Sequence, residues 1–386
     1  MRIVHMGDIH LGYKAYSRLA STGLNAREAD VLRAFRWALE RTAALNPDIV
    51  IIAGDLFHTV RPSNMVINHT FRQFQAFRAA CPAPLVIIGG NHDTPKSTDS
   101  GCILDLFTLI PDTYVVYRAY EALSFEHLGA TVYCMPYFAF TDKGRYTLKP
   151  SSKETVNILA FHGAIEDVMR HTHDPVTVRA GELNMADWDY VALGHYHVFT
   201  PIENNCYYSG SVEYTSSNIW EESHLGAKGF ILFDTQARQH EFHPTQNLRP
   251  VYDLPAIDAK KMNSGDLLLA LEDTLKVIRQ PREKVVVRVV VEAFPRQLQK
   301  DLDWQYIRRI KADYLHFELA FRPDPESSAA VWQAGASGQS RPLEVEWEEF
   351  ALSLGPGDFP KGVTAQSLLE TGRELLARTA EEEAVL

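Results

Sequence analysis

Five short polar clusters in the sequence combine carboxylate, amide and imidazole side chains, and each one follows an apolar stretch. Two of the clusters have the spacings Asp-x-His and His-x-His. In an extended segment such a spacing puts both side chains on one side of the chain, because side chains alternate with period two. The clusters supply eight residues: Asp8, His10, Asp55, Asn91, His92, His162, His195 and His197.

Oxygen and nitrogen groups of this kind predict a centre for two divalent ions that share one carboxylate. Mixed carboxylate, amide and imidazole ligation suits Mn²⁺, Fe²⁺ or Zn²⁺, and the absence of thiolates argues against a structural zinc site. Each cluster alone has an ordinary interpretation, since Gly-Asp or Asn-His-Asp can be turn chemistry and a single histidine can be satisfied in a core. All five together favour the metal interpretation.

Short apolar runs are expected to position these clusters. Ile49 to Ala53 is predicted to be a buried strand, Gly54 allows the backbone to turn, and Asp55 then stands at the carboxyl end of the strand. Similar runs, Ile3 to Met6 and Leu85 to Ile88, precede two other clusters. The carboxyl ends of strands are where α/β proteins gather their sites.

Alternating strands and helices in the first part of the chain predict an α/β layered sheet. Helices are expected over 28–44 and after Ser63, a predicted N-cap. Short strands dominate beyond residue 113, which predicts a second sheet and a two-sheet core flanked by helices. These strands are expected at Tyr114–Tyr117, Thr131–Met135, Val156–Phe161, Tyr190–Leu193, Cys206–Tyr208 and Gly229–Phe233.

The five clusters, from Asp8-Ile9-His10 to Gly194-His195-Tyr196-His197, resemble the five motifs of the calcineurin-like metallophosphoesterases. Further segments resemble one branch of that superfamily, the Mre11/SbcD DNA nucleases. They are Leu11-Gly12, Leu56-Phe57-His58, Gly210-Ser211 and Lys228-Gly229-Phe230. The resemblance covers residues 1 to about 235 and implies hydrolysis of a phosphodiester with two bound ions, for which Mn²⁺ is expected.

The resemblance also implies a role for each residue. One ion is expected on Asp8, His10 and His197, the other on Asn91, His162 and His195, and Asp55 is expected to bridge them. His92 would face the scissile phosphate and stabilise or protonate the leaving oxygen, as a histidine can near neutral pH. Asp93 would orient His92. His58 would contact the substrate phosphate or sugar, unless it caps the following helix.

Four regions are expected along the chain. Residues 1–248 form the metallophosphoesterase domain, and residues 249–322 alternate strands and helices like a small α+β domain, which resembles the DNA-capping domain of that branch by position and order. Residues 323–342, rich in Pro, Ser, Ala and Gly, are expected to be a flexible linker. A helical tail over 343–386, with candidate helices near Leu343–Leu354 and over 364–383, resembles an ATPase-docking region.

Composition is that of an ordinary globular protein, with 46% hydrophobic and 23% charged residues. No apolar run is long enough for a membrane span, a strand-like start predicts no signal peptide, and four scattered cysteines predict a reduced, cytoplasmic protein. A net charge of −11 argues weakly against nucleic acid as a partner. Ten Lys and Arg residues between 276 and 311 could line a surface that follows the phosphates of a nucleic acid, although acidic residues lie between them.

Three functions follow from these observations. The first is a manganese-dependent DNA exo- or endonuclease in double-strand break or hairpin processing, working with an SbcC/Rad50-like ATPase as a monomer or as a homodimer. The second is a phosphoesterase for a small or protein-bound phosphate. The third is a DNA- or ATPase-binding scaffold subunit whose tail helix docks on a partner.

Overall fold

The computed structural model describes residues 1–97, 101–140, 148–150, 155–166, 168, 176–323, 347, 351, 364 and 366–373. Residues Met1–Arg322 form one compact unit and Pro323–Leu386 a second. Residues 366–373 are helical. Apart from Pro323, the expected linker 323–342 lies outside the described residues, as does nearly all of the first candidate tail helix and the end of the second. No helix among the described residues is both long and apolar enough to cross a membrane.

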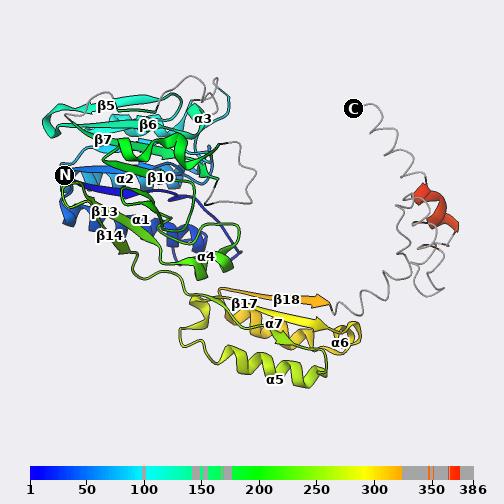
Figure 1. Ribbon diagram of the computed structural model, residues 1–386. Helices are drawn as coiled ribbons and strands as arrows, with labels where there is room; N and C mark the ends of the chain where they lie inside the picture. Colours follow the sequence, from blue (N-terminus) through cyan, green and yellow to red (C-terminus); the bar gives the residue numbers. More distant parts are fainter. Residues whose placement is uncertain are drawn as a thin grey trace. The chain divides into compact units, whose positions relative to one another are not determined.

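The first sheet has six strands in the order β14-β13-β1-β2-β3-β4 (Figure 1). Strands β1 to β4 are parallel to one another, and β13 pairs with β1 in the antiparallel sense. The central strands are nearly continuous Val and Ile runs because both faces of this sheet are covered. The strands span Arg2–Met6 (β1), Ile49–Ala53 (β2), Leu85–Ile88 (β3), Thr113–Val116 (β4), Gly229–Asp234 (β13) and Gln239–Pro244 (β14).

Helices α1 (Ala26–Leu45) and α2 (Asn64–Ala80) pack on the outer face of this sheet. The Asn25 side chain accepts hydrogen bonds from two backbone N–H groups of the first turn of α1, and Asn46 ends that helix in the left-handed conformation. Ser63 caps α2 through the Val66 N–H, as predicted.

The second sheet also has six strands, in the order β11-β12-β10-β7-β6-β5. Its inner face packs against the inner face of the first sheet, and Ile51 of β2 shares this core with Ile158 and Ala192. The expected two-sheet core flanked by helices is therefore confirmed. The strands span Glu121–Phe125 (β5), Ala130–Met135 (β6), Val156–His162 (β7), Tyr190–Gly194 (β10), Thr200–Glu203 (β11) and Cys206–Tyr208 (β12).

Two strands expected in the second sheet belong to the first. The segment near Tyr114 forms β4 beside β3, and the segment starting at Gly229 forms β13 beside β1. The prediction assigned them to the second sheet because the sequence around them is rich in short strands. Their actual partners are strands that lie far away along the chain.

A smaller sheet lies beyond residue 250, with β17 between β15 and β16 and also paired with β18. Figure 1 shows α5 and α7 on one side of this sheet, and their apolar faces fill a separate core that includes Leu271, Val289 and Ile307. The elements span Val251–Asp253 (β15), Ile257–Asp258 (β16), Ser264–Leu275 (α5), Val286–Phe294 (β17), Arg296–Asp301 (α6), Trp304–Asp313 (α7) and His316–Pro323 (β18).

The short helix α4 (Ile219–Leu225) lies between the two parts of the first unit. Its Ile219 and Trp220 share an apolar cluster with Val286 and Leu315 of the small sheet region. Other short elements include α3 (Tyr137–Phe140), β8 (Ala164–Ile165), β9 (Thr177–Val178) and a 3₁₀ helix, Ile103–Leu109.

Candidate metal centre

The predicted residues meet where five strands end. Strands β1, β2 and β3 are parallel neighbours in one sheet, and β7 and β10 are parallel neighbours in the other. The segments that follow β1 and β2 continue side by side, since Asp8 N–H donates to Gly54 O at 3.1 Å and His10 N–H donates to Asp55 O at 2.9 Å. Loops from both sheets therefore converge on one place at the edge of the core.

Four of the predicted ligand residues have a backbone conformation that L-residues rarely adopt. The φ angles are +52° at Asp8, +53° at His10, +51° at Asp55 and +104° at His195. Asp and His tolerate this region better than most residues, but each such residue still carries backbone strain. Strain of this kind collects at functional sites, where it directs side chains to a common point.

Asp55 lies at the centre of the cluster. Its Oδ1 accepts the backbone N–H of His92 at 2.9 Å. Its Oδ2 lies 3.6 Å from Nε2 of His10 and 3.5 Å from Nε2 of His162. One carboxylate oxygen therefore faces an imidazole from each half of the cluster, as a bridging ligand would.

The other predicted ligands fall into two groups on either side of Asp55. In the first, one ligand atom from each of Asp8, His10 and His197 lies within 4.8 Å of the others, and the two histidine Nε2 atoms are 3.0 Å apart. In the second, the Asn91 Oδ1 lies 3.1 Å from His162 Nε2 and 3.2 Å from His195 Nδ1. The structure thus brings together all seven predicted ligands.

Hydrogen bonds to other atoms orient the ligands. His162 donates from Nδ1 to Ala53 O at 2.8 Å, which leaves its Nε2 lone pair toward the cluster. Asp8 accepts the His195 backbone N–H at 2.9 Å and ties the β10 loop to the β1 loop. In its neutral form His162 therefore carries its hydrogen on Nδ1.

Glycines allow this close approach. A Cβ at Gly90 would lie 2.5 Å from the backbone N of Asp55, and a Cβ at Gly194 would lie 2.9 Å from His162 Nδ1. Side chains at either position would push a ligand out of place.

Burial and neighbouring charges set the protonation of the cluster. Burial lowers the pKa of His10 well below its ordinary value and also lowers the pKa of His197. Burial alone would raise the pKa of Asp55, but the neighbouring His162 and His10 outweigh it and hold that pKa below its usual range. For His162, burial opposes Asp55, and the carboxylate prevails and raises the pKa to about 9.

These observations fit a two-metal site. His10 and His197 are neutral and Asp55 is ionised, which are the forms that bind divalent ions, whereas His162 would release its proton when an ion binds. The donor set is oxygen and nitrogen only. All seven donors are buried or half-buried. Because burial of polar groups is costly unless they have partners, their convergence indicates a shared partner such as a metal ion.

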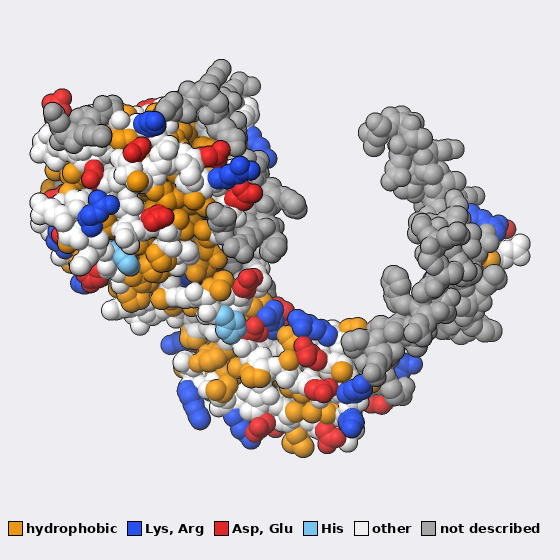
Figure 2. All heavy atoms as spheres, in the orientation of Figure 1, with side chains coloured by type: hydrophobic (Ala, Val, Ile, Leu, Met, Phe, Trp, Pro, Cys, Tyr) orange, Lys and Arg blue, Asp and Glu red, His pale blue; other side chains and the backbone are white. Residues whose placement is uncertain are grey.

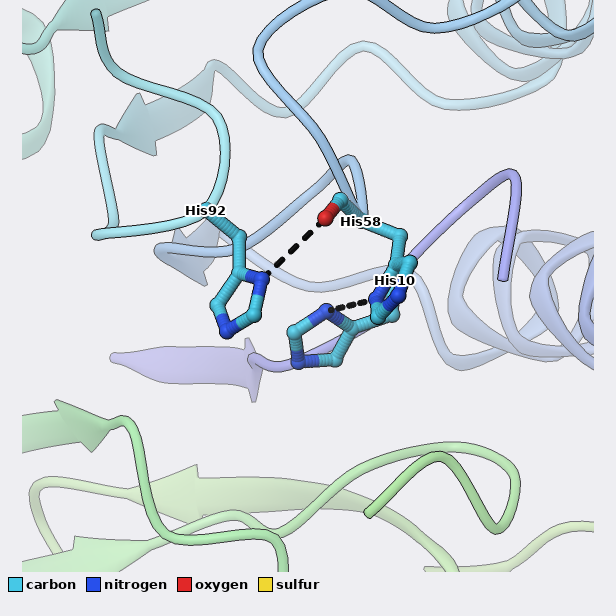
Figure 3. A group of neighbouring side chains, drawn as sticks. All are labelled: His10, His58 and His92. Carbon is cyan, nitrogen blue, oxygen red and sulfur yellow. Dashed lines mark hydrogen bonds between the residues drawn. The ribbon is translucent and has the colours of Figure 1, made fainter. Parts of the chain in front are cut away.

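His92 and His58 lie beside the cluster (Figure 3). The His92 Nδ1 is 3.1 Å from the carbonyl oxygen of His58, and the two rings are stacked with centroids 5.4 Å apart. The His58 Nδ1 lies 3.3 Å from His10 Nδ1. His58 therefore points toward the cluster, while Ser63 caps the next helix.

Asp93 has different partners from those expected. Its carboxylate accepts backbone N–H groups from Leu56 at 2.7 Å and Gly90 at 2.8 Å. Burial, reinforced by Asp55, raises its pKa to about 7. Asp93 thus supports the loops that carry the site, and the contact on the His92 ring comes from the His58 carbonyl instead.

A cleft of about 690 Å³ opens onto the cluster. His92, His58 and His197 line one part of it, and Tyr13 and Tyr196 add aromatic surface. Much of the rest of the lining comes from the segment around α4, including Thr215 and Glu222. Neither Thr215 nor Glu222 was anticipated from the sequence, because no local spacing connects either of them with His197.

The family comparison agrees with this geometry. The model of the calcineurin-like phosphoesterase family matches residues 1–199, about half of the chain, and this range includes all seven ligands. The chain belongs to the calcineurin-like phosphoesterase family. Similar proteins confirm the expected resemblance to the Mre11/SbcD branch.

One similar protein is the "DNA double-strand break repair protein Mre11" of Methanococcus maripaludis, 24% identical over 76% of this chain and 78% of that protein. Another, of the same description, is from Methanocaldococcus jannaschii, with 26% identity over 61% of this chain and 62% of that protein. A subunit of the SbcCD nuclease of Staphylococcus epidermidis is 25% identical over 72% of this chain and 76% of that protein.

Proposed function

We propose that this phosphoesterase is a two-metal-dependent DNA nuclease that processes double-strand breaks or hairpins. The observation that carries the proposal is the convergence of seven oxygen and nitrogen ligands on Asp55 beneath an open cleft. The descriptions of the similar proteins, a break-repair protein and a nuclease subunit, supply the substrate class.

Asp8, His10 and His197 would hold one ion, and Asn91, His162 and His195 the other, with Asp55 shared. We propose Mn²⁺ for both, since carboxylate, amide and imidazole ligation suits it. When bound, the two ions would polarise the phosphoryl group and activate water for in-line attack.

His92 and His58 would act on the substrate itself. The His58 carbonyl accepts the hydrogen of His92 Nδ1, so the opposite nitrogen, Nε2, is the atom available to give a proton to the leaving 3′ oxygen. His58 faces the cleft and would contact the substrate phosphate or sugar. Asp93 would act by supporting the loops beneath them.

The phosphoesterase domain would comprise residues 1–248, and the small α+β region 249–322 would cap the DNA. Three basic residues of that region are paired with acidic neighbours. Lys276 lies 3.1 Å from Asp273, Arg282 lies 3.3 Å from Asp313 and Arg288 lies 2.7 Å from Asp253. On the face shown in Figure 2, Lys and Arg alternate with Asp and Glu over this region.

That mixed surface, with the net charge of −11, favours a second candidate, a phosphoesterase that acts on a small or protein-bound phosphoester with the same ions. The third candidate is a scaffold whose tail docks on an ATPase. Its function would require that this complex forms but would not require phosphoester hydrolysis.

As the nuclease subunit, the protein would work, as a monomer or as a homodimer, with an SbcC/Rad50-like ATPase bound through the tail over 343–386. Its four cysteines are buried free thiols, which suits the cytoplasm, our proposed location.

The test is cleavage of end-labelled single- and double-stranded DNA with Mn²⁺, by the parent chain and by His92→Ala. Loss of a positioned proton donor would reduce cleavage about 10²–10⁴-fold while Mn²⁺ binding is kept. An exposed histidine outside the cluster, His127, gives the matched control His127→Ala, which should cleave like the parent.

Turnover of a small phosphodiester without cleavage of any DNA, also in the presence of the partner ATPase, would favour the second candidate. Unimpaired cleavage by His92→Ala would refute the role of His92. Failure of the parent chain to bind Mn²⁺ would refute the two-metal mechanism itself.

A further inference from the structure

A buried ion pair lies directly behind the metal ligand His197. Lys228, just before β13, and Glu222, in α4, have side chains only 1% and 3% exposed, and Lys228 Nζ pairs with Glu222 Oε1. Lys and Glu are almost never buried unless they are paired, and such a pair adds little net stability because both charges lose their hydration. Its position, therefore, matters more than its strength.

Lys228 fixes the backbone of His197. Its Nζ donates to the His197 carbonyl oxygen at 2.6 Å, and the backbone N–H of Ser211 donates to the same oxygen at 3.1 Å. Two donors on one carbonyl leave the loop after β10 little freedom at this residue.

Glu222 lies near the ring of His197. Its Oε1 is 3.9 Å from His197 Nδ1, and the Thr215 hydroxyl is closer, at 3.3 Å. The carboxylate is itself held, since its Oε2 accepts the Ser216 N–H at 3.1 Å and its Oε1 pairs with Lys228. Thr215 is thus the direct partner of Nδ1, and Glu222 supplies a fixed negative charge on the same side.

This arrangement decides which nitrogen of His197 faces the metal site. A negative charge and an acceptor beside Nδ1 favour the tautomer with its hydrogen there, so the lone pair is on Nε2. Nε2 lies 3.0 Å from His10 Nε2, in the group that also contains Asp8.

We propose that Glu222 and Lys228 are positioning residues for His197, with Lys228 holding its backbone and Glu222 orienting and polarising its ring toward one ion. The proposal deepens the two-metal function and rests on it. A purely structural pair, which only attaches α4 to β13, is the competing explanation.

The experiment measures Mn²⁺ binding to the full chain by electron paramagnetic resonance of the free ion, alongside thermal unfolding without metal. The variants are Glu222→Gln, Lys228→Met and the double variant that carries both. The matched control is Glu213→Gln, which removes a carboxylate that is 2% exposed and paired with Arg27.

Loss of a residue that orients a ligand typically weakens metal binding about 10–100-fold. We expect a loss of this size for one of the two ions in each single variant, with the second ion less affected. The double variant has no unpaired buried charge and should regain thermal stability, but its metal affinity should stay low. Glu213→Gln should unfold earlier and bind Mn²⁺ like the parent.

Parental affinity in Glu222→Gln, while the parent binds two ions, would overturn the positioning role and leave the proposed function intact. Equal weakening in Glu213→Gln, or recovery of affinity together with stability in the double variant, would also overturn it. A parent chain that binds no Mn²⁺ would overturn both. If a single variant fails to fold, the double variant decides.

Discussion

Gly90→Ala tests whether Asp55 must occupy its observed position between the two groups of ligands. A Cβ at residue 90 would lie 2.5 Å from the backbone N and 2.7 Å from Cγ of Asp55, whereas ordinary contacts begin at 3.4 Å. Asp55 must therefore retreat by about 1 Å, because interiors are close-packed and the neighbouring backbone is held by the Gly90 N–H bond to Asp93. The φ angle of Gly90 is not positive, so the substitution adds no backbone strain of its own.

A displacement of about 1 Å at a reacting centre costs on the order of 100-fold in rate. We expect Gly90→Ala to lower kcat for Mn²⁺-dependent hydrolysis of a small phosphodiester by about this factor, and to weaken Mn²⁺ binding. The matched control is Gly181→Ala, because a Cβ there would meet no atom within 4 Å. Circular dichroism checks that both variants are folded.

Parental metal affinity and a rate within about threefold of the parent in Gly90→Ala would refute this reasoning. Such a result would mean that Asp55 does not bridge, or that the loop yields without moving the carboxylate. Loss of activity in Gly181→Ala as well would point to general sensitivity of the fold.

Three further predictions concern stability. Burial lowers the pKa of His5 from 6.5 to about 3. As the pH falls below 6.5, His5 therefore binds a proton in the unfolded chain but stays neutral in the folded chain. The free energy of unfolding drops by up to about 1.4 kcal/mol per pH unit in this window. The fall in unfolding free energy from about pH 7.5 to 5.5 should be about 1.4 kcal/mol smaller in His5→Gln, and an unchanged slope would contradict this. Mn²⁺ at about 100 times its Kd should stabilise the chain by about 2.7 kcal/mol in urea unfolding, and a chelator should abolish the gain; no shift would argue against specific binding. Arg249→Met should lower the free energy of unfolding by about 3 kcal/mol, because Arg249 makes two hydrogen bonds to buried Asp30 and joins the β15 segment to α1. A loss below about 0.5 kcal/mol would show that Arg27 and Arg33 are enough to neutralise Asp30.

The central strands and most of the metal centre could be predicted from the sequence because both have local signals. Ile49–Ala53 is a buried strand on composition alone, and Gly54 with Asp55 marks its end. The Asp-x-His and His-x-His spacings identify ligands without knowledge of the fold. Parallel pairing of β1, β2 and β3 then brings distant loops to one edge.

Other features have no local signal. β13 returns to the first sheet through antiparallel pairing with β1, more than 220 residues away along the chain, and the edge strand β14 is largely polar. Glu222 reaches His197 only because α4 packs between the phosphoesterase core and the small sheet. For Asp93, the resemblance implied that it orients His92, but the turn directs its carboxylate to backbone N–H groups instead.

The strained backbone of the ligand residues follows from the same construction. Positive φ angles occur at Asp8, His10, Asp55 and His195, and each costs about 1–3 kcal/mol. This cost is large for a marginally stable chain, so other interactions must hold these residues in place. The hydrogen bonds that hold them run between loops, from His195 to Asp8 and from His92 to Asp55, so the backbone of one loop keeps a ligand of another in place. The cluster is therefore one cooperative unit, and substitutions within it should be non-additive: once Asp55 has moved, loss of a second ligand should cost less than it does in the parent chain.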